Sequence, residues 1–259
     1  FRPDVVLTAL GLSFHSVRIA SHLGIPSLVY HHAYECCPPT GEQRLSWGVS
    51  AEHDHLGREE AKFVSRHAER IVACSSFLRD HVRRTGGSCQ RFIYPEFDPE
   101  RVVIPARRPS PQGFITGVCG YAYKGAEVFL ELARSFPEER FQVCGNLDPA
   151  FRRRFEAQAN ITIVSTVTTK EMLRNSKIVI VPSHWPEPFG RTAVEAMGNG
   201  IPGLVSATGG LPEATAGPAH QVRDFRNVVE WRVRLEELLE SETARERNGE
   251  LGRRLSKRF

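Results

Sequence analysis

Short runs of β-branched and aromatic residues alternate with stretches of helical pattern along this chain, and no other feature constrains its fold as strongly. Strand-like runs occupy residues 5–10, 27–31, 70–75, 114–119, 140–144, 161–164, 178–181 and 201–205. Helical patterns occupy residues 16–22, 51–68, 77–85, 126–135, 149–158, 170–175 and 192–197, and the tail from residue 227 is helical as well. Strands that are separated by helices form parallel sheets, so we expect an α/β fold.

A change of composition divides the pattern into two halves. Residues 102–113 contain three prolines and two arginines, which is typical of a linker. The length of 259 residues is compatible with two domains of ordinary size. We therefore expect two Rossmann-like domains that face a cleft, at residues 1–107 and 108–259.

The composition excludes several classes of protein. A hydrophobic content of 41% and a charged content of 25% are those of a globular protein, and no apolar run is long enough to span a membrane. The net charge of +4 is too small to indicate nucleic-acid binding. Basic residues cluster at positions 107–108, 152–154 and 253–258. These clusters predict solvated surface, with attraction to anionic substrates or peripheral membrane contact as the alternative. Six cysteines without a C-x-x-C pair indicate buried thiols and a cytoplasmic location.

The chemically informative segment is residues 181–213, VPSHWPEPFGRTAVEAMGNGIPGLVSATGGLPE. A buried strand ends here and a loop leads into a helix. Gly190 lets the backbone approach a ligand closely, and the first amides of a helix lack intrahelical partners. We therefore expect an anion site at four consecutive residues, Phe189, Gly190, Arg191 and Thr192.

Two carboxylates, Glu187 and Glu195, flank this anion site. They would repel an anion unless the ligand also offers hydroxyl groups, and a nucleotide sugar offers both. Lys124 and the turn at Gly209 and Gly210 also follow strands, so we expect them at the same carboxyl edge of the sheet. Lysine is a suitable point charge for a phosphate.

These motifs resemble a known family. E-P-F-G-R-T-A-V-E, G-I-P and G-G-L-P-E are similar to the donor half of the retaining glycosyltransferases of family four, which have the GT-B fold. Upstream, P-D-V-V, G-I-P-S and I-V-A-C-S-S-F-L resemble strands of that family's amino-terminal domain. The resemblance extends from about residue 3 to the end of the chain.

The resemblance implies a role for each matching residue. Glu195 matches the glutamate that binds the ribose hydroxyls, and Glu187 matches the one beside the donor sugar. Lys124 matches the lysine on the diphosphate. His31 matches a histidine of the amino-terminal domain that faces the donor sugar, and Val167 falls where backbone groups meet the base.

The family also implies the reaction: glycosyl transfer from a nucleotide-diphospho-sugar, of UDP type, to an acceptor hydroxyl with retention of configuration. Catalytic roles then fall to Glu187, Lys124 and His31. No cofactor is implied, and the absence of a D-x-D motif favours a donor site without metal. The acceptor is open, whether glycan, lipid-linked molecule or small molecule, and the loop at residues 33–48 is the expected contact.

The sequence also departs from the family pattern. Cys119 stands where many members have a second diphosphate cation, an arginine, so we expect an arginine introduced there to assist Lys124 if the strand end faces the diphosphate. The family's amino-terminal Gly-rich loop is missing, which indicates an excerpt of a longer protein.

Other interpretations remain open at this stage. Each glutamate alone could be structural, His53 and His55 on a helix face different ways and do not indicate a metal, and Trp185 could stack on a base or fill the loop. A nucleotide-sugar epimerase on the same fold, or a binding module without catalysis, is the alternative function. A nicotinamide dehydrogenase is disfavoured because no G-x-G-x-x-G follows a strand.

Overall fold

The computed structural model describes residues 2–9, 12–34, 58–105, 107, 112–165, 168–215, 217 and 220–259. The chain divides into two compact units. The first consists of Phe1–Pro95 with Glu187–Phe189, and the second of Glu96–Pro186 with Gly190–Phe259.

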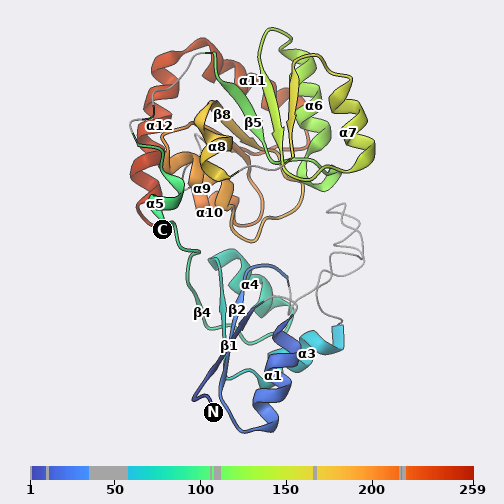
Figure 1. Cartoon of the computed structure of the whole chain (residues 1–259), viewed down its shortest axis with the longest axis vertical. Coiled ribbons are helices and arrows are strands. Elements are labelled where there is room, and N and C mark those ends of the chain that lie inside the picture. The colour runs from blue at the N-terminus through green and yellow to red at the C-terminus, as the bar shows by residue number, and fades with distance from the viewer. Residues whose placement is uncertain are drawn as a thin grey trace. The chain divides into compact units, whose positions relative to one another are not determined.

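The first unit contains a four-stranded parallel sheet in the order β1-β2-β3-β4 (Figure 1). Its elements are β1 (Val6–Ala9), α1 (Ser13–His22), β2 (Ser27–His31), α3 (Arg58–His67), β3 (Arg70–Ala73), α4 (Ser76–Arg84) and β4 (Arg91–Phe92). All but β4 fall within or beside segments predicted from the sequence. Helix α4 begins where it does because the Ser75 side chain accepts a hydrogen bond from the Leu78 amide, as N-cap residues do.

The two faces of this sheet differ. The strands follow one another in a single direction, and right-handed connections then place their helices on one face. Val29 and Ile71, which are paired in register, lie on the covered face and are 0% and 2% exposed. Leu7 points to the opposite face and is 71% exposed. Parallel sheets normally have both faces covered, so this sheet has one incomplete layer among the described residues.

The second unit is built around a six-stranded parallel sheet in the order β10-β9-β8-β5-β6-β7. Its strands are β5 (Phe114–Gly117), β6 (Phe141–Cys144), β7 (Ile161–Val164), β8 (Ser176–Val181), β9 (Gly203–Ser206) and β10 (Gln221–Val222). Its helices are α5 (Pro99–Val102), η3 (Ala122–Lys124), α6 (Ala126–Ser135), α7 (Pro149–Glu156), α8 (Thr169–Arg174), α9 (Arg191–Gly198), α10 (Leu211–Thr215), α11 (Val228–Glu240) and α12 (Glu242–Ser256).

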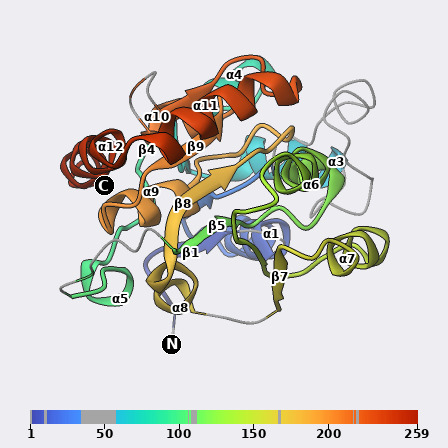
Figure 2. The ribbon, with the colours of Figure 1, turned by 90° about the horizontal axis from the view of Figure 1, so that it is seen from above.

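Helices cover both faces of this second sheet. On one face Phe129 of α6, Phe155 of α7 and Trp231 of α11, all 0% exposed, form one cluster with the central strands. On the other face Leu173 of α8 and Ala196 of α9 pack on the sheet, and α12 lies along α9 (Figure 2). The central strands are buried from both sides, which explains their nearly continuous apolar sequences.

The segment after the first unit packs onto the second. Val102 and Ile104 are buried, although the sequence indicated a linker here. The Asn199 side chain at the end of α9 accepts a hydrogen bond from the Ile104 amide (2.8 Å) and donates one to the Val102 carbonyl (3.1 Å). The contacts therefore divide the chain earlier than residue 107, and the division into domains 1–107 and 108–259 stays a prediction.

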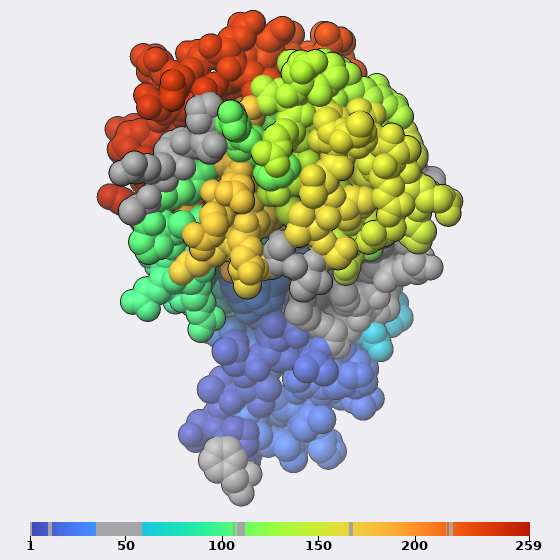
Figure 3. Space-filling model, turned by 45° about the horizontal axis from the view of Figure 1, so that its top comes forward, coloured from blue at the N-terminus to red at the C-terminus, as the bar shows by residue number. Residues whose placement is uncertain are grey.

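The arginine clusters lie at the surface of the second unit, where α7 forms part of the outer face (Figure 3). Arg153 is exposed, and Arg154 makes two hydrogen bonds of 2.6 Å to the Glu127 carboxylate. Arg253 and Arg254 on α12 are exposed as well. These charges are solvated, as the sequence predicted. Arg107 differs: it is half-buried, its guanidinium donates hydrogen bonds to the Leu173 and Ser176 carbonyls, and burial lowers its pKa to about 10.

Candidate functional site

The candidate site of the second unit lies where the strand order reverses. Strand β5 comes first in this unit, and its neighbours β6 and β8 continue the sheet in opposite directions. Connections that leave neighbouring strands in opposite directions open a crevice at the carboxyl edge, where doubly wound folds bind ligands. The connection after β5 contains η3 and Lys124, and the connection after β8 is the loop at residues 182–190.

These two connections touch through their backbones. The Tyr123 carbonyl accepts hydrogen bonds from the amides of both His184 and Trp185, each 2.9 Å long. Gly125 has φ +83°, and a Cβ at this position would lie 1.9 Å from the Pro182 carbonyl oxygen. Only glycine fits such an approach. Lys124, which stands between Tyr123 and Gly125, is therefore held beside the loop that follows β8.

Lys124 has aromatic surroundings. Its ammonium group lies 5.8 Å from the centre of the Tyr123 ring, within the range of a cation–π contact. The Tyr123 ring in turn meets that of Trp185 edge-on, with 6.2 Å between ring centres. Trp185 therefore packs on the segment that contains Lys124.

The start of α9 has the geometry of an anion site. Gly190 has φ +115°, and a Cβ there would lie 2.6 Å from a methyl carbon of Leu211. The first helical hydrogen bond is donated by the Ala193 amide to the Gly190 carbonyl. The amides of Arg191 and Thr192 thus precede the helical bonds of α9, where backbone N–H groups are available to an anion.

The second glycine turn lies against this helix start. Gly209 has φ +63°, and Gly210 is the last residue before α10. Leu211 of α10 packs with Ala193 of α9 and Val205 of β9. The structure therefore brings together the two glycine turns that the sequence placed at one sheet edge.

Glu195 lies one turn into α9 and is largely enclosed. Its side chain is 12% exposed, and one carboxylate oxygen is 3.3 Å from the Arg191 guanidinium, which is 64% exposed. Burial raises the pKa of Glu195, while Arg191 opposes that rise. An enclosed carboxylate beside a helix N-terminus can accept hydrogen bonds from ligand hydroxyls.

Residues 187–189 are grouped with the first unit. The Phe189 ring, 4% exposed, lies 5.4 Å from that of Tyr94, and the Pro188 carbonyl accepts a hydrogen bond of 2.5 Å from the Ser75 hydroxyl. Glu187 stands next to this anchored pair and is half-buried. The loop is thus fixed directly after Glu187.

His31 lies at the carboxyl end of β2 and is 0% exposed. Its carbonyl accepts a hydrogen bond from the Cys74 amide (2.9 Å).

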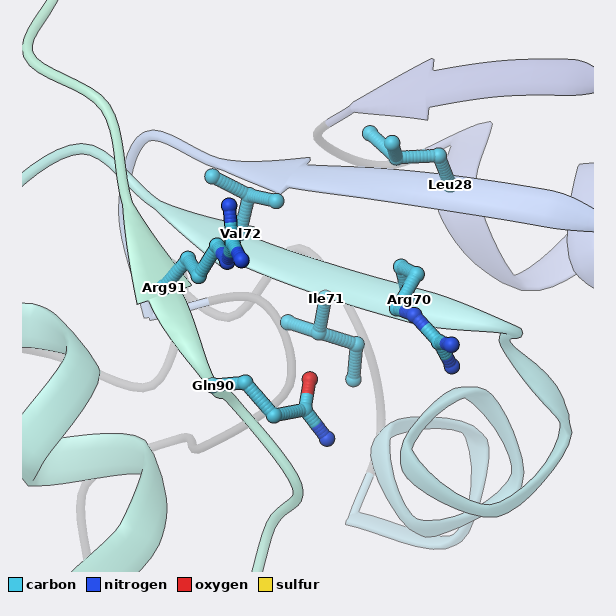
Figure 4. Close-up of a pocket in the computed structure, with 6 residues that line it drawn as sticks. All are labelled: Leu28, Arg70, Ile71, Val72, Gln90 and Arg91. Carbon is cyan, nitrogen blue, oxygen red and sulfur yellow. The ribbon is translucent and has the colours of Figure 1, made fainter.

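A hollow of about 600 Å³ occurs in the same unit, where β3 and β4 begin (Figure 4). It is lined by Leu28, Arg70, Ile71, Val72, Gln90 and Arg91. Because it is at the amino ends of β3 and β4, it does not include His31. Val167 lies outside the described residues.

Two further positions near this edge of the sheet are fully buried. Cys119 is 0% exposed within the hydrophobic cluster of the second sheet, and burial raises the pKa of its thiol. An arginine at this position would bury an unpaired charge instead of reaching the diphosphate. Ser183, which the sequence did not single out, is 0% exposed and donates a hydrogen bond of 2.9 Å to the Trp185 carbonyl.

The described residues also bear on metal binding and on membrane insertion. No cluster of three or more His, Cys, Asp or Glu side chains there could hold a metal ion. None of the described helices combines the length and the apolar character required to cross a bilayer.

Comparison with known proteins places this geometry in a wider group. A model of the family described as glycosyl transferases group 1 matches residues 120–255. Spore coat protein SA of Bacillus subtilis (strain 168) is 33% identical over 100 residues, which cover 37% of this chain and 26% of that protein. This chain therefore spans about a quarter of the length of that relative.

Two solved structures are similar over nearly the whole chain. Sucrose-phosphate synthase from Thermosynechococcus elongatus has a TM-score of 0.78 at 19% identity, over 98% of this chain and 69% of its own. HepE from Anabaena, solved in complex with UDP-glucose, has a TM-score of 0.78 at 16% identity, over 98% of this chain and 74% of its own. These similarities confirm the GT-B fold.

Proposed function

Because this chain belongs to the group 1 glycosyltransferases, we propose that it transfers a sugar from a nucleoside-diphosphate sugar to an acceptor hydroxyl, with retention of configuration. The observation that carries this proposal is the backbone contact between Tyr123 and the loop after β8, which holds Lys124 at the crevice where the strand order reverses. A cation and helix amides at such a crevice suit a diphosphate. HepE, with the same fold, was solved with UDP-glucose, which supports a donor of UDP type.

In this proposal the diphosphate is held by Lys124 and by the amides of Gly190, Arg191 and Thr192. Negative charge on the diphosphate grows as the bond to the sugar breaks. Preorganised donors that face this charge lower the barrier because they need no rearrangement during the reaction. The absence of a D-x-D motif in the sequence favours these groups over a divalent metal.

The two glutamates bind different parts of the donor. Glu195, enclosed beside the helix start, accepts hydrogen bonds from the ribose hydroxyls. Glu187 contacts the sugar and stabilises positive charge at the reacting carbon. Phe189 with Gly190, and Gly209 with Gly210, line the donor, and His31 and Val167 complete the predicted set at the sugar and the base.

Retention requires the acceptor to attack the face that the diphosphate leaves. The anomeric carbon loses its bond to the phosphate oxygen and gains a bond to the acceptor oxygen. The acceptor proton passes to a phosphate oxygen of the departing diphosphate. This route needs no nucleophilic side chain, which agrees with the lack of an evident nucleophile in the donor motif.

A binding panel followed by turnover tests the proposal. Sugar nucleotides of UDP, GDP, ADP and TDP are compared by thermal shift, since a ligand that binds the folded chain raises its melting temperature. Stabilisation by at least one of them, unchanged by EDTA, is expected, and loss of binding with EDTA would contradict the metal-independent site.

Turnover then separates the proposed function from its alternatives. A transferase releases nucleoside diphosphate in response to acceptor, or slowly to water. Isomerisation of the donor without release would instead indicate an epimerase, and binding without either reaction would indicate a binding module.

A further inference from the structure

We propose that the buried hydroxyl of Ser183 is a positioning group for Lys124. It acts through a small network, here called the Tyr123 clamp, which consists of the Tyr123 carbonyl, the His184 and Trp185 amides and the Ser183 hydroxyl. The consequence for catalysis rests on the proposed function, in which Lys124 meets the diphosphate.

The clamp fixes the backbone on both sides of Lys124. Before it, the Tyr123 carbonyl accepts the two amide hydrogen bonds of 2.9 Å from the loop after β8. After it, Gly125 touches the Pro182 carbonyl so closely that a Cβ would overlap with it. The position of the Lys124 Cα is therefore set by the loop and not by η3 alone, which is a single short turn.

Ser183 holds the loop in the shape that makes this contact. Its hydroxyl is 2.9 Å from the Trp185 carbonyl and 3.5 Å from the Tyr123 carbonyl. A hydroxyl has one proton, and the shorter contact takes it. This bond folds residues 183–185 into a turn that points the His184 and Trp185 amides at Tyr123. The side chain is 0% exposed, so water cannot replace the hydroxyl at no cost.

Ser206 supplies a matched control. It lies at the carboxyl end of β9, is also 0% exposed, and its hydroxyl is 3.5 Å from the Val181 carbonyl. Ser206→Ala removes an equally buried hydroxyl from the next strand and leaves the Tyr123 carbonyl, the His184 and Trp185 amides and the Ser183 hydroxyl in place.

The first experiment does not depend on activity. Amide hydrogen exchange is measured for the wild type, Ser183→Ala and Ser206→Ala. Loss of the turn should speed the exchange of the His184 and Trp185 amides by about tenfold in Ser183→Ala and leave it unchanged in Ser206→Ala. Wild-type exchange of these two amides in Ser183→Ala would overturn the clamp.

The second experiment tests the link to Lys124 by steady-state kinetics on the complete protein. Ser183→Ala should lower kcat by about two- to tenfold with little change in KM, because Lys124 acts on the departing diphosphate. In a Lys124→Ala background, Ser183→Ala should lower kcat by less than about twofold, because the effects of groups that act through one another are not additive. Ser183→Cys, which keeps a weaker donor, should fall between wild type and Ser183→Ala.

The outcomes separate the two proposals. Full additivity with Lys124→Ala, or an equal loss of kcat in Ser206→Ala, would show that Ser183 is only structural. A wild-type protein that neither binds nor consumes any sugar nucleotide would contradict the proposed function, while the amide exchange would still decide whether the clamp exists.

Discussion

The two units use the same parallel β–helix–β arrangement, but they differ in how their strand ends are organised. In the second unit, both faces of the sheet are covered, and the segments that follow β5, β8 and β9 contact one another at Tyr123, Gly125 and Gly190. In the first unit, one face of the sheet carries exposed apolar side chains, and His31 is the residue of its own strands that was expected at the donor. This difference indicates that the packing of the second unit preorganises its strand ends for a ligand.

Preorganisation of the second unit predicts a large stability effect in its core. Phe129, 0% exposed, packs edge-on against Phe141 and directly over Gly117. Phe129→Ala should lower the free energy of unfolding by about 3–5 kcal/mol, measured by urea denaturation, because the cavity cannot collapse. Leu7→Ala, on the exposed face of the first sheet, should change it by less than about 0.5 kcal/mol. An equal loss for Leu7→Ala would contradict the exposure of this face of the first sheet.

The next largest effect is expected at Lys124. Lys124→Ala should reduce kcat/KM by about 10²–10³, the range for loss of one preorganised donor, because no second cation replaces it at the buried Cys119. Steady-state kinetics on the complete protein measures this. Lys257→Ala, an exposed lysine after α12, is the control. A nearly normal kcat/KM for Lys124→Ala would remove this lysine from the site.

Most of the regular structure could be predicted from the sequence, and particular elements show why. Strand Ile161–Val164 and helix Ala126–Ser135 match their predicted ranges, because each is an apolar pattern closed by turn-forming residues. The short elements η3, α5 and α10 were missed, since a single turn has no periodicity to detect.

The site could be predicted only where it is contiguous in sequence. Glu195 and Gly190 belong to one motif, and the structure brings Lys124 and Gly209 to the same sheet edge. Ser183 gave no signal, because the turn that it holds contacts the Tyr123 carbonyl, 60 residues away from Ser183, and this contact exists only once β5 and β8 lie side by side. The burial of Cys119, in contrast, agrees with the apolar run in which the sequence places it.

The two glutamates extend the comparison, because Glu195 belongs to the second unit and Glu187 is grouped with the first. Glu195→Ala should weaken binding of a free nucleoside diphosphate by about 1.5–3 kcal/mol, the value of hydrogen bonds to a charged acceptor. Glu187→Ala should leave this binding nearly unchanged and depress turnover of the sugar nucleotide. Calorimetric titration measures both variants. A larger loss for Glu187→Ala than for Glu195→Ala would reverse the assignment.

The smallest expected effect follows from the enclosure of Glu195. Its pKa is raised by burial above the ordinary value of 4.5, so the folded chain holds the proton more tightly than the unfolded chain does. The stability that this proton provides is complete below the ordinary pKa and is lost as the pH rises through the raised one. At neutral pH the enclosed carboxylate therefore destabilises the fold.

Glu195→Gln removes the buried negative charge that destabilises the fold at neutral pH. The variant should melt slightly higher than wild type at pH 7, and the difference should vanish in acid, where the wild-type carboxyl is protonated as well. The same variant should bind a nucleoside more weakly at pH 7, because an amide is a poorer acceptor for ribose hydroxyls than a carboxylate. Glu250→Gln is the matched control. The Glu250 carboxylate is also 3.3 Å from an arginine of its own helix, Arg253 of α12, but the Glu250 side chain is 76% exposed. A lower melting temperature for Glu195→Gln at pH 7 would mean that the pairing with Arg191 outweighs burial, and that the second unit stabilises this carboxylate before any ligand arrives.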